Sequence, residues 1–140
     1  MRPMHPECNL PIRFGEFPEA WDSVLVVLFH EGRLVLGLNG TRGGWEFPGG
    51  HREGQEHWQE TARREAWEEA GAIVGELTHV GYYEIPGRHT TLIAHAIASR
   101  LDELPAGFEM VDRGVFDELP GNLTFDDGLY EAILHRLRDA

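Results

Sequence analysis

The chain has 140 residues, of which 41% are hydrophobic and 26% charged, enough for one globular domain with its own core. We therefore predict a single domain over residues 1–140. Its 24 acidic and 12 basic residues give a net charge of −12, which argues against sequence-independent binding to nucleic acid, so we predict no such partner. All 12 basic residues are arginine. Without lysine, neither a P-loop nor Schiff-base chemistry is possible.

The N-terminal half begins with a proline-containing lead-in, residues 1–20. The apolar run 24–29 is rich in β-branched residues and does not alternate, which predicts a strand covered on both faces. Residues 30–32 resemble a turn, and residues 33–38 form a second apolar run, so the pair predicts a hairpin. A glycine-containing loop, 39–44, follows.

The C-terminal part alternates between helix and strand patterns. We predict a helix from about Gln55 to Ala70, ended by Gly71, and a last amphipathic helix over 126–137. We predict strands over 77–85 and 90–99 and an edge strand over 110–116. This order predicts an α/β fold with a mixed sheet between helices.

Targeting signals and membrane spans are not evident in the sequence. No stretch approaches the roughly 20 apolar residues of a membrane helix, and the first residues lack the apolar core of a secretory signal. The single cysteine, Cys8, cannot form an internal disulfide. We therefore expect a cytoplasmic protein without a membrane partner, as a monomer or homodimer.

Three glutamates share one face of the first predicted helix. Glu65, Glu68 and Glu69 lie at i, i+3 and i+4, so their like charges are close together. Carboxylate oxygens are the ligands that Mg²⁺, Mn²⁺ or Ca²⁺ require, and such a cation would compensate the repulsion. The alternative is a solvated helix face, because Arg64 stands four residues from both Glu60 and Glu68 and could pair with either.

Residues 50–72 resemble a known family. Gly50, five residues, Glu56, seven residues and then the run Arg64 to Ala72 fit the 23-residue signature of the Nudix hydrolases at every fixed position. The preceding run 45–50 (WEFPGG) is similar to the usual entry to this signature. Two positions that are bulky and aliphatic in the signature, 66 and 72, are alanine, which affects packing and not metal ligation.

The resemblance implies a fold, a cofactor and roles for site residues. It implies an α/β/α sandwich with a mixed β-sheet, and hydrolysis of a diphosphate linkage by a metal-activated water with Mg²⁺ or Mn²⁺. The implied metal ligands are Glu65, Glu68, Glu69 and the carbonyl of Gly49. Arg64 would orient a ligand glutamate, and Glu56 would support the site or add a ligand. Glu65 is the first candidate for the general base. Glu109 is the second, although it could be an ordinary loop acid.

The resemblance is less specific about the substrate. The small size of the chain and its tail, residues 107–123, are similar to bacterial members that cleave oxidised guanine nucleotides. This implies a nucleoside triphosphate substrate, with 8-oxo-dGTP as one candidate, cleaved to nucleoside monophosphate and pyrophosphate. Asn122 could then contact a purine edge, and Phe47 or Tyr83 could stack on the base, although Phe47 fits the core equally well. Three arginines are candidates for phosphate binding: Arg42, Arg52 and Arg88.

Other functions of the same fold are the alternatives. ADP-ribose, an ADP-sugar or a dinucleoside polyphosphate could be the substrate. A nucleotide-sensing module without catalysis would have lost glutamates of the signature, and all of them are present here. Isoprenoid diphosphate isomerisation would need a cysteine in the pocket, and Cys8 lies well before the first predicted strand.

Overall fold

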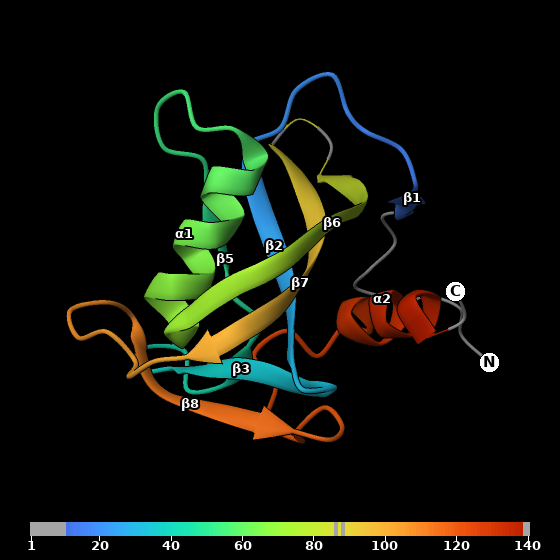
Figure 1. The fold of residues 1–140 in the computed structure, drawn as a ribbon. Coiled ribbons are helices and arrows are strands. Elements are labelled where there is room, and N and C mark those ends of the chain that lie inside the picture. The colour runs from blue at the N-terminus through green and yellow to red at the C-terminus, as the bar shows by residue number, and fades with distance from the viewer. Residues whose placement is uncertain (1–10, 86, 88, 139–140) are drawn as a thin grey trace.

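A mixed β-sheet with a helix on either side forms the fold (Figure 1). The computed structural model describes residues 11–85, 87 and 89–138. The two helices are α1 (Trp58–Ala70) and α2 (Leu129–Arg138). This arrangement confirms the predicted α/β class. No helix in the described part of the chain is long and apolar enough to span a bilayer.

The sheet has eight strands, in the order β1-β6-β7-β2-β3-β4, with β5 paired to β2 and β8 to β3. The pairing of β2 with β7 is parallel and the others are antiparallel. The strands are β1 (Arg13–Phe14), β2 (Ser23–His30), β3 (Arg33–Asn39), β4 (Trp45–Glu46), β5 (Gly49–His51), β6 (Ala72–Ile85), β7 (His89–Leu101) and β8 (Met110–Phe116).

Strand β2 lies in the interior, as its unbroken apolar run predicts. Its residues Ser23 to Leu28 are all buried, because other elements cover both faces of the strand. The predicted hairpin with β3 is confirmed. Glu31 and Gly32 both have positive φ, 52° and 80°, as a two-residue hairpin turn of type I′ requires.

Both helices begin later than the sequence pattern predicts. The first begins at Trp58 because residues 53–56 form a turn: the Glu56 amide donates to the Glu53 carbonyl, and Gly54 has a φ of 57°. The second begins at Leu129 because Gly128 has a φ of 84° and the Leu129 amide donates to the Asp127 carboxylate. Strands β6 and β7 are longer than predicted and form one extended hairpin.

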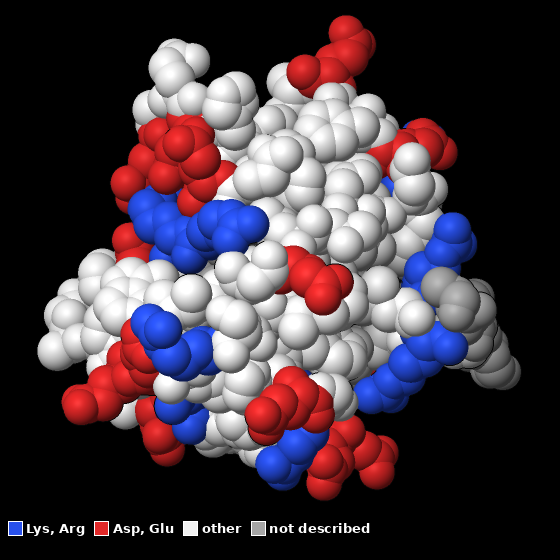
Figure 2. All heavy atoms as spheres, in the orientation of Figure 1, with Lys and Arg blue, Asp and Glu red and all other residues white. Residues whose placement is uncertain are grey.

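Helix α1 packs on the sheet through its small residues. Ala62, Ala66 and Ala70 are completely buried, so the helix backbone lies close to the strands. The glutamates next to this alanine strip therefore lie at the border between helix and sheet. On the described part of the face in Figure 2, acidic and basic side chains lie side by side over α1, and no continuous basic patch crosses that face.

Candidate active site

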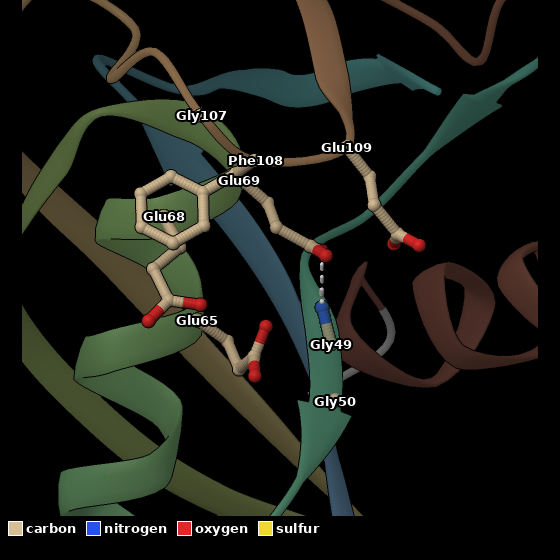
Figure 3. A pocket seen from close by; sticks show the side chains of 8 residues that line it. All are labelled: Gly49, Gly50, Glu65, Glu68, Glu69, Gly107, Phe108 and Glu109. Carbon is tan, nitrogen blue, oxygen red and sulfur yellow. Dashed lines mark hydrogen bonds between the residues drawn. The ribbon is translucent and has the colours of Figure 1, made fainter. Parts of the chain in front are cut away.

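Four carboxylates line one pocket at the border of α1 and the sheet (Figure 3). Glu65, Glu68 and Glu69 come from α1, and Glu109 comes from the loop that precedes β8. Strand β5 contributes Gly49 and Gly50. We call this cleft of about 540 Å³ the carboxylate pocket. The structure thus brings the three glutamates of α1 together with Gly49 and Glu109, which lie far from them in the sequence.

Glu69 is held against strand β5. Its Oε1 accepts a hydrogen bond of 3.0 Å from the Gly49 amide, which Figure 3 shows as a dashed line. Burial, together with the nearby carboxylates of Glu65, Glu46 and Glu109, raises the pKa of Glu69 to about 8. Without a cation, this carboxyl therefore holds a proton at neutral pH.

Glu65 is the most buried carboxylate on α1. The residue is 6% exposed, and burial raises the pKa of its carboxyl to about 7 even though Arg64 donates to it. The carboxylate faces Gly50, where a Cβ atom would overlap it. The space that Glu65 occupies therefore exists only because residue 50 has no side chain.

The close approach at Gly50 leads to a mutational test. In Gly50→Ala, we expect the added methyl group to displace the Glu65 carboxylate and lower the affinity for Mn²⁺ by roughly 10- to 100-fold. Stability should change by about 1 kcal/mol or less, because the group that moves is the end of a side chain. Calorimetric Mn²⁺ titration and thermal unfolding measure the two effects. Gly121→Ala is the control, because nothing lies within 4 Å of its added Cβ. Equal Mn²⁺ affinity in both variants would contradict the expectation.

Arg64 joins several acidic groups beside the pocket. Its Nε donates to Glu56 Oε2 at 2.8 Å, and its Nη1 donates to Glu65 Oε2 at 2.9 Å. Nη1 lies 3.5 Å from Glu68, and Nη2 donates to the His51 carbonyl at 2.8 Å. The contacts with Glu56 and Glu65 raise the pKa of Arg64 above its ordinary value. Arg64 is thus placed to orient Glu65.

Glu56 belongs to this ion-pair network and does not line the carboxylate pocket. The hydrogen bond from Arg64 lowers the pKa of Glu56 to about 2, and the Thr61 hydroxyl and the Glu53 amide also donate to its carboxylate. With its oxygens engaged in this way, Glu56 is suited to hold Arg64 in place.

The donor set of the pocket fits a hard divalent cation. Four carboxylates without a basic side chain among the pocket-lining residues provide the oxygen ligands that Mg²⁺ and Mn²⁺ prefer. Burial and the neighbouring carboxylates raise the pKa values of Glu65 and Glu69, and a bound cation would offset both effects. Within residues 11–85, 87 and 89–138, no three acidic, histidine or cysteine side chains are close enough together to coordinate a metal ion. The carboxylates of the pocket would therefore have to move to bind a cation.

Metal binding should therefore release protons. Near pH 7, Glu65 and Glu69 are partly protonated, and we expect binding of Mn²⁺ to expel about one proton. Calorimetry in two buffers that differ in ionisation enthalpy measures this number. The double variant Glu65→Gln/Glu69→Gln is the control and should release none. A binding heat of the wild-type protein that does not depend on the buffer would contradict the expectation.

The same groups predict how stability depends on pH. The unfolded chain loses these protons near pH 4.5, whereas the folded chain holds them until about 7 and 8. Their contribution to stability is therefore complete below pH 4.5 and disappears as the pH rises through these values. In buffers with a chelator, we expect the melting temperature of the protein, relative to that of the Glu65→Gln/Glu69→Gln variant, to fall from about pH 5 to about pH 9. A relative melting temperature that rises over this range would contradict the assignment.

A second cavity adjoins the carboxylate pocket. It has a volume of about 430 Å³ and shares Gly49 and Gly50 with the carboxylate pocket. We call it the aromatic cavity, after the four aromatic residues that line it: Phe47, Tyr83, Phe125 and Tyr130. The rings of Phe47 and Tyr130 pack edge to face with centroids 4.8 Å apart, and the Phe47 amide donates to the Tyr130 hydroxyl. A flat ring could bind here while attached phosphates reach the carboxylates.

The predicted substrate-binding residues are divided between the cavity and other places. Phe47, Tyr83 and Arg42 line the aromatic cavity, and Phe47 is at the same time a core residue, only 2% exposed. Arg52 lies over the Trp21 ring and donates to the Glu56 carbonyl, outside both pockets. Asn122 donates to the Gly43 carbonyl and also lies outside them. Arg88, like Cys8, falls outside the described residues.

Arg113 is a supporting residue that the sequence patterns do not indicate. Helix α1 has no basic residue in its last turn, and Arg113 of β8 supplies one from another part of the chain. Its Nη1 donates to the carbonyls of Ala70 and Asp102. One side chain thus links the end of α1, next to Glu69, to the segment that leads to Glu109.

Comparison with known proteins places this site in a family. The family model described as NUDIX domain matches residues 20–126. The Bacillus subtilis (strain 168) protein named "Putative 8-oxo-dGTP diphosphatase YtkD" is 33% identical over 111 residues, covering 77% of this chain and 70% of that protein.

Solved structures show the same fold. A crystal structure of a mutant of the Bacillus subtilis pyrophosphohydrolase BsRppH has a TM-score of 0.83 and 28% identity, covering 93% of this chain and 90% of that one. An ADP-ribose pyrophosphatase from Streptococcus suis 89-1591 has a TM-score of 0.62 and 20% identity, covering 84% and 89%, a likeness in fold alone. Together, the family model, the sequence relative and the glutamates of α1 show that this chain belongs to the Nudix hydrolase family, whose enzymes generally use divalent metals.

Proposed function

We propose that this Nudix hydrolase cleaves nucleoside triphosphates to nucleoside monophosphate and pyrophosphate, with 8-oxo-dGTP as the first candidate substrate. The observation that carries the proposal is the junction at Gly49 and Gly50, where the carboxylate pocket meets the aromatic cavity. A base and its phosphate chain can therefore be bound at the same time. The similarity to the Bacillus subtilis protein named as an 8-oxo-dGTP diphosphatase supports the choice of 8-oxo-dGTP.

The carboxylate pocket would hold the metal. Glu65, Glu68 and Glu69 would bind Mg²⁺ or Mn²⁺, with the Gly49 carbonyl as a further ligand. When bound, the cation would neutralise part of the diphosphate charge and lower the pKa of a bound water molecule. The hydrogen bond from the Gly49 amide keeps the Glu69 carboxylate beside β5, where it would face the phosphate chain of a nucleotide whose base occupies the aromatic cavity.

Other polar residues at the pocket would accept the proton of the attacking water or hold the accepting group in place. Glu65 is the first candidate to take the proton from the attacking water, because its carboxylate lines the pocket and is held in place by Arg64 Nη1. Glu109, on the opposite wall, is the second. Arg64, itself held by Glu56, fixes the direction of the Glu65 carboxylate.

The aromatic cavity would hold the base. Tyr83 and Phe125 line the cavity, and the rings of Phe47 and Tyr130, which also line it, pack edge to face against each other. Binding of phosphate oxygens by Arg52, and contact of Asn122 with a purine edge, stay predictions.

A substrate panel tests the proposed function. It compares dGTP, 8-oxo-dGTP, the other nucleoside triphosphates, ADP-ribose and dinucleoside polyphosphates, with Mg²⁺ and with Mn²⁺. We expect the triphosphates to give monophosphate and pyrophosphate, with the highest kcat/KM for 8-oxo-dGTP. A higher kcat/KM for ADP-ribose than for any triphosphate would overturn the proposal, and so would release of orthophosphate in place of pyrophosphate.

A further inference from the structure

An ion pair at the wall of the aromatic cavity is left unexplained by the proposed chemistry. Arg42 donates to the Glu46 carboxylate twice, from Nε to Oε2 at 2.8 Å and from Nη2 to Oε1 at 3.0 Å. The Glu46 side chain is 5% exposed, and that of Arg42 is 46% exposed. The Arg42 amide also donates to Asn39 Oδ1 at 2.8 Å, which fixes the backbone at this residue. The guanidinium thus has one defined position.

This geometry leaves one edge of the guanidinium available. A guanidinium has five N–H donors, and the two hydrogen bonds to Glu46 use only the edge formed by Nε and Nη2. The second edge, formed by Nη1 and Nη2, offers two parallel donors, and no acceptor for Nη1 is recorded among the described residues. The Phe125 ring lies 5.6 Å from Arg42 Cζ, and both residues line the aromatic cavity, so a flat ligand in the cavity can contact the ring and reach the guanidinium.

The surroundings favour a neutral acceptor over a phosphate. Glu46 cancels the charge of Arg42, and Glu69 and Glu109 add further negative charge nearby, which together raise the pKa of Arg42. The long-range attraction of this group for a phosphate is therefore small. Its hydrogen-bond donors nevertheless keep their directions, and the cavity around them is lined by aromatic rings.

We propose that Arg42 is a specificity-determining residue that donates to the O6 atom of a 6-oxopurine and so selects guanine-type bases over adenine. This inference rests on the proposed function. Guanine presents two neighbouring acceptors, O6 and N7, whereas adenine presents an amino donor at C6 that would face the Arg42 donors. Oxidation at C8 keeps the O6 atom, so 8-oxo-guanine stays in the selected class. The role differs from the phosphate binding that the sequence suggests for Arg42.

Binding of the product nucleotides tests the inference without turnover. The dissociation constants of dGMP, dIMP and dAMP are measured by calorimetry, and kcat/KM is measured for dGTP, dITP and dATP. Hypoxanthine shares O6 and N7 with guanine but lacks the 2-amino group. We expect dGMP and dIMP to bind the wild-type protein at least about 10-fold more tightly than dAMP. In Arg42→Lys, which keeps the charge and loses the two-donor edge, the preference should fall to about threefold or less.

Two further variants make the outcome decisive. Arg42→Met/Glu46→Gln removes both charges, so no buried carboxylate is left unpaired, and it should also lose the preference. Arg33→Lys changes an exposed arginine paired with Asp117 outside both pockets and should keep it.

The inference is overturned if Arg42→Lys weakens all three nucleotides equally, as for a phosphate ligand, or if dIMP binds like dAMP. Failure of the proposed function would be distinct, because the wild-type protein would then cleave ADP-ribose better than any triphosphate, or release orthophosphate, whatever its preference among the three nucleotides.

Discussion

Replacement of Glu65 by glutamine should lower kcat by about 10²- to 10⁴-fold, the range for loss of a general base. Glutamine has nearly the same shape and its amide oxygen can still accept from Arg64 Nη1, but it can neither take a proton nor bind a cation strongly. Steady-state kinetics with saturating Mg²⁺ measure the effect. Since burial raises the pKa of Glu65 to about 7, the wild-type protein must keep a buried negative charge at pH 8. The metal-free variant should therefore melt at the same or a higher temperature there.

Glu60→Gln is the matched control on the same helix. Glu60 accepts from the His57 amide at the start of α1 and lies outside the carboxylate pocket, and glutamine can replace it in this capping arrangement. The control should keep wild-type kcat. If Glu65→Gln retains activity like that of the control, Glu65 is not the general base, and Glu109→Gln becomes the next variant to measure.

Replacement of Arg64 by methionine should cost about 3 kcal/mol of stability and most of the activity. The side chains of Glu56 and Glu65 are 19% and 8% exposed, so the variant would leave two largely buried carboxylates without their cation. Urea unfolding at pH 7 measures the loss. The lowered pKa of Glu56, about 2, adds a pH dependence: this pair stabilises the fold above pH 4.5, and its contribution is lost as the pH falls towards 2.

The neighbouring residue provides the control for Arg64. Arg63 donates to the Val74 carbonyl, a single hydrogen bond, so Arg63→Met should cost only about 1 kcal/mol and little activity. The difference between the variants should shrink as the pH falls from 4.5 towards 2, because Glu56 becomes protonated. A difference that stays constant over this range would contradict the ion-pair account.

The carboxylate pocket could be predicted because its main residues come from one regular element. In a helix, the spacing of Glu65, Glu68 and Glu69 is enough to place them on one face, and the completely buried Ala66 shows which face contacts the sheet. For Glu109, only the resemblance to the Nudix hydrolases indicates a place in the site. Its position in the pocket depends on the path of the loop before β8, which no periodic pattern describes.

The aromatic cavity could not be predicted in the same way. Its walls combine Phe47, Tyr83, Phe125 and Tyr130, which come from separate parts of the chain and meet only in the tertiary structure. Arg42 and Glu46 are four residues apart, but they lie in a loop and a short strand, where no regular periodicity determines the directions of their side chains. Arg113 reaches the end of α1 from a strand more than 40 residues later, as its hydrogen bond to Ala70 shows.

The junction at Gly49 and Gly50 has a consequence for the position of cleavage. Both residues belong to β5, which is paired with the central strand β2, and a Cβ atom at Gly49 would approach the Val24 carbonyl to 2.9 Å. The separation between the aromatic cavity and the carboxylate pocket is therefore set by rigid backbone. In the proposed function, this fixed separation would determine which phosphorus atom of the nucleotide is attacked, so a nucleotide that binds one phosphate further out would be cut at a different bond.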